Sequence, residues 1–408
     1  MTKQAHTNPF NIVVIVAALG YFVDVYDLII FGIVKDSSLM AIGITGAAQI
    51  KAAGVYLLNL QLIGLILGGI VWGILGDKKG RMSTLFLTIL LYSLANIANG
   101  FVQNIDQYAV LRFIAGFGLA GELGVSITLV SEVMTKETRA YGSGLVSFIG
   151  IMGAALAFYV SEFGWKQAYW FGGTLGLLLL ALRVYVHESG MFDKLKTSEV
   201  KRGNFMSLFT NKKRFFKYIS CIFIGLPTWF TIGILVFFAK DFALKLGITQ
   251  PVTNGRAILY HYIGASIGSM VISLISQQLK SRKKAIIIAL TALFSFSAWY
   301  FMSEGVSANR FYFIIFVLGI AMGYWSIFVT VASEQFGTNI RSTVTTSVPN
   351  FVRGSAVLML LAWQYLEPQM GIVHSAITVG CVALILALIG VFYIEESYGK
   401  DIDYVEVE

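Results

Sequence analysis

Charged residues are scarce in this 408-residue chain: 13% of the residues are Asp, Glu, Lys or Arg, and 57% are hydrophobic. A soluble domain carries about 25% charged residues, so the composition excludes an ordinary soluble protein. Apolar stretches of about 20 residues, the length that a helix needs to cross a bilayer, recur along the whole chain. Because a helix satisfies its own backbone polar groups in lipid, we predict an all-α polytopic membrane protein.

Cysteine, histidine and proline are also rare. The two cysteines, Cys221 and Cys381, fall in apolar stretches, so we expect neither a disulfide framework nor cysteine spacing suited to a metal. The four histidines are scattered, at positions 6, 187, 261 and 374. We therefore expect no metal and no cofactor. The five prolines include Pro227 and Pro349, which lie inside apolar stretches and predict helix kinks there.

The net charge of +8 does not indicate a nucleic-acid partner, because the basic residues lie in short loops between apolar stretches. Such loops carry the lysines and arginines that orient a protein in the membrane. The first apolar stretch is too long for a signal peptide and no small-residue cleavage site follows it. We therefore predict that it is retained as a span.

The apolar stretches predict twelve spans in two groups of six. The spans lie at residues 11–34, 53–75, 82–102, 108–134, 141–163, 168–186, 216–239, 256–278, 285–303, 310–334, 343–366 and 373–394. We predict two six-helix bundles, at residues 1–187 and 216–408, joined by a basic linker at residues 188–215. Because basic loops stay in the cytoplasm, we place the linker and both termini on the cytoplasmic side of an inner membrane.

The two halves of the chain repeat several residue patterns. One pattern is a Ser-Glu pair followed by an arginine, and its two copies are 202 residues apart: Ser131, Glu132 and Arg139, then Ser333, Glu334 and Arg341. Glycines recur at a similar offset, at 64, 68 and 121, then at 264, 268 and 323. Matches in this order indicate duplicated halves, and in transporters built this way the substrate binds between the repeats near the midplane.

Residues 73–81, GILGDKKGR, resemble the loop motif G-x-L-[AG]-D-[KR]-x-G-R of the major facilitator superfamily. A glycine permits the tight turn, which holds an acid and bases at a helix end. The resemblance implies a gate that latches the cytoplasmic side. We expect the gate to comprise Gly73, Gly76, Asp77, Gly80, Arg81, Glu132, Arg139, Glu334 and Arg341. The corresponding segment of the second half, residues 276–280, has lost the acid, so we expect an asymmetric latch.

Residues 111–132, LRFIAGFGLAGELGVSITLVSE, form a predicted span that carries Arg112, Glu122, Glu132 and four glycines. A charge at membrane depth costs several kcal/mol and therefore faces a cavity or a partner, whereas glycines let a neighbouring helix approach closely. The stretch resembles the fourth helix of the sugar porters and metabolite–proton symporters, whose pattern is R-x-x-x-G-x-G-x-G-x-E. Residues 20–27, 187–189 and 394–400 resemble the same group.

Two acids in the first span are candidates for proton coupling. Asp27 lies roughly 10 Å from the outer end of its helix and Arg112 roughly 7 Å from the outer end of the fourth, so an ion pair between them is possible. In proton-coupled sugar porters the matching acid and arginine form the pair whose protonation drives the cycle. A structural salt bridge is the alternative. Asp24, one turn deeper on the same face, is either the carboxylate that faces the substrate or the proton site.

Two further charges lie near the membrane midplane. Glu122 either opens onto the central cavity, where it would join proton coupling or substrate binding, or packs in protonated form against a hydroxyl. Arg353, in the predicted eleventh span, cannot neutralise itself and needs a carboxylate. That carboxylate comes from Asp24, from Glu122 or from a bound substrate, and we favour a clamp on an anionic substrate.

Polar and aromatic residues complete the predicted substrate site. Gln61 and His261 occupy equivalent positions in the two halves, and His261 could titrate, although a lone histidine is more often a packing residue. The other candidates are Asn59, Trp229, Tyr324, Trp325 and Asn350. Most aromatic residues in such bundles belong to the core or to the lipid belt.

These patterns indicate a secondary transporter rather than an enzyme, because no histidine accompanies pairs such as Ser131-Glu132 to build a catalytic group. We predict a monomeric symporter that moves a small polar solute together with protons by alternating access. Three acids and one arginine suit an organic acid, a zwitterion or a carboxylate chelate, and a neutral sugar stays open. A proton-coupled efflux antiporter, an uncoupled facilitator and a transporter-like membrane sensor are the alternatives.

Overall fold

The computed structural model describes residue 8 and residues 10–182 and 200–406, and this part of the chain is helical, without strands. The first group of helices comprises α1 (Ile12–Ala41), α2 (Ala47–Lys79), α3 (Arg81–Asn99), α4 (Ile105–Val133), α5 (Arg139–Ile151), α6 (Gly153–Ser161) and α7 (Trp165–Leu182). The second comprises α9 (Ser207–Thr210), α10 (Lys212–Phe230), the π-helix η2 (Thr231–Val236), α11 (Ala239–Lys245), α12 (Asn254–Gln278), α13 (Arg282–Phe301), α14 (Ala308–Met322), α15 (Trp325–Glu334) and α16 (Arg341–Tyr393).

These helices confirm the predicted polytopic all-α fold. Among the described residues, ten segments are long and apolar enough to cross a membrane. One of them, α16, contains two spans, because the backbone at Gly371 is non-helical with φ 79°. Helix α7 supplies the described part of the sixth predicted span. The end of that span, residues 183–186, lies outside the described residues, as do residues 187–189 and the first part of the predicted linker, 188–199.

Helix breaks occur at positions other than the predicted proline kinks. Pro349 lies within continuous helix, and α16 changes direction at Gly371 instead. Pro227 lies inside α10, and the π-helix η2 begins four residues after it, where the Thr231 hydroxyl donates to the Pro227 carbonyl at 2.9 Å. The fifth and tenth spans are each divided in two, at Met152 and at Gly323–Tyr324.

Equivalent glycines pack the two groups of helices in the same way. A Cβ atom on Gly64 or Gly68 of α2 would collide with the carbonyl of Phe113 or Phe117 of α4. In the second group, a Cβ on Gly264 or Gly268 of α12 would collide in the same manner with carbonyls of α14, those of Phe316 and Ile320. Small residues allow such close helix contact in membranes, and the repeated contacts agree with the repeat in the sequence.

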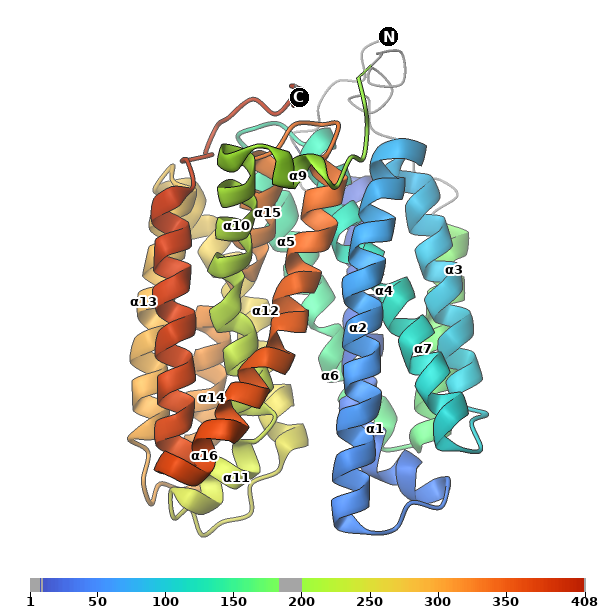
Figure 1. Cartoon of the computed structure of the whole chain (residues 1–408), viewed down its shortest axis with the longest axis vertical. Helices are drawn as coiled ribbons and strands as arrows, with labels where there is room; N and C mark the ends of the chain where they lie inside the picture. Colours follow the sequence, from blue (N-terminus) through green and yellow to red (C-terminus); the bar gives the residue numbers. More distant parts are fainter. Residues whose placement is uncertain (1–7, 9, 183–199, 407–408) are drawn as a thin grey trace.

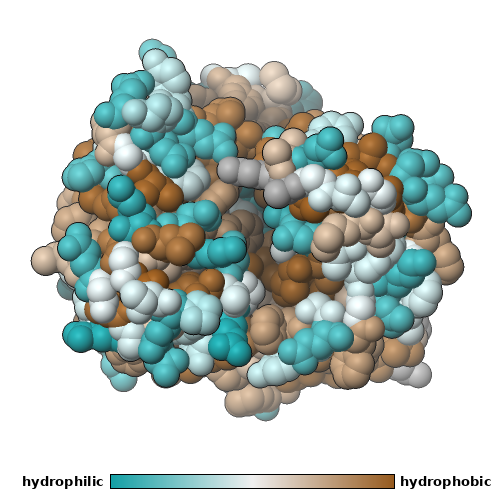
Figure 2. All heavy atoms as spheres, turned by 90° about the horizontal axis from the view of Figure 1, so that it is seen from below, coloured by the Kyte–Doolittle hydropathy of each residue, from teal (hydrophilic) through white to brown (hydrophobic). Residues whose placement is uncertain are grey.

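The helices form two bundles, α1–α7 and α10–α16, which lie side by side (Figure 1). We call the upper face in Figure 1, where α2 and α4 end and α16 begins, the terminal face. Towards this face α2 lies directly against α16, at Gly69 and Gly73. Farther from it an apolar cleft opens between α2, α10 and α16, lined among others by Ile66, Leu226 and Val357. Figure 2 shows that the opposite face is hollowed between the bundles.

Candidate functional site

Buried charges gather where the bundles meet at the terminal face. We call these residues the gate network: Asp77, Arg81, Glu132, Arg139, Arg282, Glu334 and Arg341. Within the first bundle, Nη2 of Arg81 lies 2.8 Å from Oε1 of Glu132 and 3.5 Å from Oδ1 of Asp77. All three side chains are buried. Arg81 begins α3 directly after Gly80, whose φ of 109° favours glycine.

Two ion pairs of the gate network cross between the bundles. Nη1 of Arg341 lies 2.9 Å from Oε1 of Glu132, and Nη1 of Arg139 lies 3.3 Å from Oε1 of Glu334. The two pairs are copies of each other: Arg139 and Arg341 each also donate from Nε to a carbonyl eight residues earlier, at 3.0 and 3.1 Å. The repeated Ser-Glu and Arg pattern therefore builds one reciprocal lock.

Asp77 makes a further contact between the bundles, and its partners are backbone and hydroxyl groups of α16 rather than an arginine. Its Oδ1 accepts from the backbone N–H of Ser342 at 3.0 Å, and its Oδ2 accepts from the backbone and hydroxyl of Thr343 at 2.8 and 2.7 Å. These groups lie in the first turn of α16, where a carboxylate is favoured by the helix dipole. An acid at the end of α2 thus caps a helix of the other bundle.

Arg282 is a gate residue that sequence reasoning missed. It begins α13 as Arg81 begins α3, and its Nη2 lies 3.1 Å from Oε1 of Glu334. The Ser397 hydroxyl donates to the other oxygen of Glu334 at 2.7 Å. The latch was expected to be asymmetric because the second half lacks the acid of the loop, and Arg282 shows that the arginine of the loop is present in both halves. The offset between Arg81 and Arg282 is close to that of the other repeated residues, which could have revealed the pair.

The gate glycines allow α2 to reach α16. A Cβ on Gly73 would lie 2.7 Å from the Cα of Thr343, and a Cβ on Gly76 would collide with the Ser342 hydroxyl. Any larger residue would push the two helices apart. With its ion pairs made and its helices in contact, the terminal face is closed.

A second cluster of buried charges lies deeper in the bundle interface. Nη2 of Arg353, on α16, lies 3.6 Å from Oδ2 of Asp24 on α1. Arg353 also donates from Nη1 to Oδ1 of Asn350 at 3.2 Å, and its guanidinium lies 5.9 Å from the Trp325 ring centroid. The side chain is 2% exposed. The candidate partners of Arg353 were Asp24, Glu122 and a substrate carboxylate, and in the structure Arg353 contacts Asp24.

Tyr21 joins this cluster and was not among the predicted site residues. Its hydroxyl accepts from Nε1 of Trp325 at 3.1 Å, across the bundle interface. Asn350 makes another such contact, because its Nδ2 donates to the carbonyl of Ala120 at 2.8 Å. The signal in the sequence was the i, i+3 spacing that places Tyr21 and Asp24 on one face of α1.

Glu122 lies on α4 beside this cluster. Its Oε1 accepts from the Ser126 hydroxyl at 3.3 Å, the hydroxyl contact that we considered as one alternative. Its side chain is buried, and it lies close enough to Asp24 for the two charges to interact. The structure thus gives Glu122 a hydroxyl partner and a place near the central pair.

Asp27 and Arg112 do not form the predicted ion pair. In the part of the chain that the structure describes, Arg112 donates from Nη2 to Asn96 at 2.9 Å and from Nε to Asn99 at 3.3 Å. Both oxygens of Asp27 are buried without a hydrogen-bond partner. The two residues share a depth, as expected, but the amides of α3 compete for the guanidinium. The asparagines were missed because sequence spacing does not show which face of α3 meets α4.

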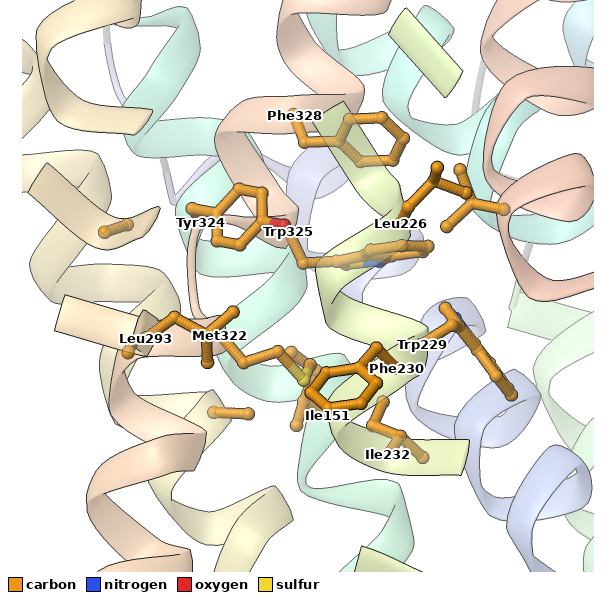
Figure 3. Close-up of a cluster of buried hydrophobic side chains, with 14 of the residues drawn as sticks. Ile151, Leu226, Trp229, Phe230, Ile232, Leu293, Met322, Tyr324, Trp325 and Phe328 are labelled. Atoms are coloured by element: carbon orange, nitrogen blue, oxygen red, sulfur yellow. The ribbon is translucent and has the colours of Figure 1, made fainter. Parts of the chain in front are cut away.

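The other candidate residues are dispersed. Gln61 is buried with both amide atoms unpartnered among the described residues. His261 lies in the second bundle with its Nε2 3.0 Å from Sδ of Met322, and the Tyr324 hydroxyl donates to the Ile224 carbonyl at 2.9 Å. Asn59 is half-buried on α2. Figure 3 shows Trp325 between Tyr324 and Leu226, and Trp229 projecting from α10 on the side away from Leu293 and Met322.

No group of three or more His, Cys, Asp or Glu side chains among the described residues could hold a metal ion. The side chains gathered in the centre are carboxylates, a guanidinium group, an amide and aromatic rings.

Comparison with known proteins gives a consistent set of relatives. The family model described as Major Facilitator Superfamily matches residues 12–359. A probable 4-methylmuconolactone transporter of Cupriavidus pinatubonensis is 26% identical, covering 95% of this chain and 90% of that protein. A putative niacin/nicotinamide transporter of Bacillus subtilis is 24% identical, covering 96% of each chain. The solved structure of the proton:xylose symporter XylE matches with a TM-score of 0.75 at 15% identity, covering 96% of this chain and 97% of that chain.

Proposed function

The chain belongs to the Major Facilitator Superfamily, and from that premise we propose that it takes up a small organic acid together with a proton by alternating access. The observation that carries this proposal is Arg353. Its guanidinium lies in the bundle interface, 3.6 Å from a carboxylate of the opposite bundle. A substrate carboxylate can replace Asp24 at this position and gain the bidentate contacts that a guanidinium offers.

Two features support an acid that carries a ring. The Trp325 ring lies against the guanidinium, and Tyr21 is hydrogen-bonded to Trp325. Planar rings stack favourably on such surfaces. Two relatives are named as transporters of 4-methylmuconolactone and of niacin or nicotinamide, which are small ring compounds. We infer that this chain carries a substrate of the same chemical kind.

Proton coupling is assigned to Asp27. An ionised carboxylate buried without a partner costs several kcal/mol, and Asp27 has no hydrogen-bond partner or ion pair in the described structure. We therefore assign Asp27 its neutral, protonated form in this state. A neutralised acid and a bound monovalent anion together leave the charge of the site unchanged, which makes one proton per monovalent anion the expected stoichiometry.

The terminal face is assigned to the cytoplasm of an inner membrane. The basic residues of the loop 78–81 and of residues 280–284 lie at this face, as the positive-inside rule requires. In this orientation both chain ends are cytoplasmic, and the hollow in Figure 2 opens to the outside. We propose that this is a cytoplasm-closed state of a monomer with two bundles, at residues 1–187 and 216–408, joined by a linker at 188–215.

Uptake by purified protein in liposomes tests the proposal. We expect nicotinate and benzoate to be accumulated, and glucose and proline to be excluded, when the outside is more acidic. Arg353→Ala should raise KM for the acid by tenfold or more, because a charge-assisted hydrogen bond contributes ~1.5–3 kcal/mol. Arg256→Ala, which changes an exposed arginine at the start of α12, is the matched control. An unchanged KM in Arg353→Ala, or uptake of the neutral sugar alone, would overturn the proposal.

A further inference from the structure

The apolar cleft between α2, α10 and α16 has no part in the proposed transport. Its volume is about 800 Å³, and both bundles line it: Leu62, Ile63 and Ile66 belong to α2, and the other lining residues to α10 and α16. The lining includes the hydroxyls of Ser355 and Thr378, which donate to carbonyls of their own helix at 2.6 and 2.9 Å. Ordered water needs two to four polar partners, so hydrocarbon suits this cleft better than water does.

One face of α10 joins this cleft to the terminal face, where the helix begins (Figure 1). The face starts with Lys212 and continues, at intervals of four and three residues, with Phe216, Ile219, Phe223 and Leu226. Residues at this spacing lie on the same side of a helix. The last three line the cleft, whereas Lys212 and Phe216 are exposed. At 1.5 Å of rise per residue, Lys212 lies roughly 10 Å along the helix from Ile219.

The residues around Lys212 suit the boundary between lipid headgroups and hydrocarbon. Phe216 packs against Tyr393 with ring centroids 5.8 Å apart, and both side chains are exposed. Tyrosine is enriched at this depth of a membrane. The acid Glu395 pairs with Lys213 at 3.2 Å, and no acid among the described residues forms an ion pair with Lys212. The Lys212 ammonium is therefore available to an anion from outside the described chain.

We propose that the cleft binds one acyl chain of an anionic phospholipid from the leaflet at the terminal face, with the lipid headgroup on Lys212. The chain passes along Phe216 and Ile219 into the cleft, where it contacts both bundles. Lysines near the membrane surface attract anionic lipids, and each methylene that leaves water or a looser environment for a packed apolar wall adds favourable contacts. The inference does not depend on which solute the protein carries or on proton coupling.

Photo-crosslinking of the full-length protein in phosphatidylcholine liposomes tests this site. The probes are trace amounts of phosphatidylglycerol or of phosphatidylcholine, each with a diazirine on one acyl chain, and mass spectrometry locates the labelled peptides. The phosphatidylglycerol probe should label the cleft residues of α2 and α10 about fivefold more than the phosphatidylcholine probe does. Lys212→Ala should abolish this difference, because Lys212 supplies the charge that distinguishes the two headgroups. Equal labelling of the cleft by both probes in the wild type would overturn the proposal.

Further variants separate a bound lipid from lipid that only surrounds the protein. Lys284→Ala, which removes an exposed charge at the start of α13, should leave the headgroup preference unchanged. Ser355→Phe fills the cleft and should lower its labelling by both probes. Ser295→Phe is the matched control, because Ser295 is exposed on α13 and also donates to a carbonyl of its own helix. A preference that survives Lys212→Ala, or cleft labelling that survives Ser355→Phe, would contradict the site.

Discussion

The buried charges of this chain differ in how completely they are satisfied. In the gate network Glu334 accepts from Arg139, Arg282 and Ser397. In the centre, Asp24 meets Arg353 at 3.6 Å, and neither of its oxygens has a hydrogen-bond partner. A buried ion pair stabilises a protein only when its hydrogen bonds are complete. The central pair is therefore a weak contributor to stability and one that a ligand can replace.

Asp24→Asn should destabilise the protein in a way that an anion reverses. The substitution leaves Arg353 buried without a counter-charge, which costs ~3–5 kcal/mol, so Tm should fall. A bound carboxylate supplies the missing charge, and nicotinate should therefore raise Tm more in the variant than in the wild type. Thermal unfolding of the purified protein, with and without nicotinate, measures both effects.

The matched control for this variant is Asp36→Asn. Asp36 lies on the same helix, is exposed and, among the described residues, pairs with Lys35 at 3.4 Å, so its loss should change neither Tm nor the response to nicotinate. An Asp24→Asn protein whose Tm does not respond to any of the carboxylates tested would contradict the role of Arg353 as an anion clamp.

Sequence reasoning located the buried charges but did not assign all of their partners. The positions of Asp24, Asp27, Arg112 and Arg353 followed from charge in apolar stretches. Which group each one contacts depends on the rotation of the helices, which the pattern of a single helix does not fix. For Arg112, neutral amides of α3 took the place of the expected carboxylate.

Helix α16 closes the terminal face by contacting α2 and α4 at positions where only glycine fits. On α4, a Cβ at Gly124 would collide with the Cα of Thr346. Gly124→Val should therefore hold α16 away from α4 and favour the state that is open at the terminal face. The valine shifts the population towards the open state because it clashes with α16 only when the terminal face is closed.

The labelling rate of the thiol in Thr128→Cys measures this shift. The two native cysteines, Cys221 and Cys381, are replaced by Ser in this protein. Thr128 is fully buried one turn after Gly124, beside Thr345. In inside-out vesicles an impermeant thiol reagent should label it at least several-fold faster in Gly124→Val than in the parent. Gly32→Val, which places the same side chain in open space on α1, should not change the rate, and equal rates in all three proteins would exclude the closure role.

The chain segment after α16 should detach in acid through Glu396. Its Oε2 accepts from the Ser281 hydroxyl, and its Oε1 accepts from the backbone N–H of Arg282 at 2.9 Å. Burial alone would raise the pKa of Glu396, but these and further backbone hydrogen bonds outweigh it and lower the pKa. The contact is thus present above the usual pKa of about 4.3 and is lost as the pH falls through the lowered value.

Limited proteolysis of this segment between pH 7 and pH 3 measures the effect. Cleavage after α16 should accelerate in the acid part of the range in the wild type. Glu396→Gln should be cleaved faster already at pH 7 and should show little further pH dependence. A wild-type profile without an acid limb would show that Glu396 does not anchor the segment.

The elements themselves were largely predictable, whereas their interruptions were not. Helix length and apolar content are properties of a sequence window, so the described helices fall where spans were predicted. The divisions at Met152 and Gly371 and the π-helix η2 were not predicted. Pro349 lies inside continuous helix, because its neighbours in a membrane bundle can accommodate the missing N–H.

At the scale of the whole molecule, the ion pairs of the gate network are duplicated and the central charges are not. The pairs Arg139–Glu334 and Arg341–Glu132 are copies produced by the repeat. The central acids come from the first bundle, and Arg353 comes from the second. Alternating access in such a fold rocks one bundle against the other around the central site, so a symmetric lock can release without disturbing an asymmetric site.

Proton-driven accumulation of nicotinate in proteoliposomes tests the central claim most directly. An acidic outside should drive uptake above equilibrium in the wild type, and a protonophore should abolish that accumulation. Asp27→Asn should still exchange external for internal nicotinate but should lose accumulation driven by the gradient. Accumulation that does not depend on the pH gradient, or that persists in Asp27→Asn, would contradict the account.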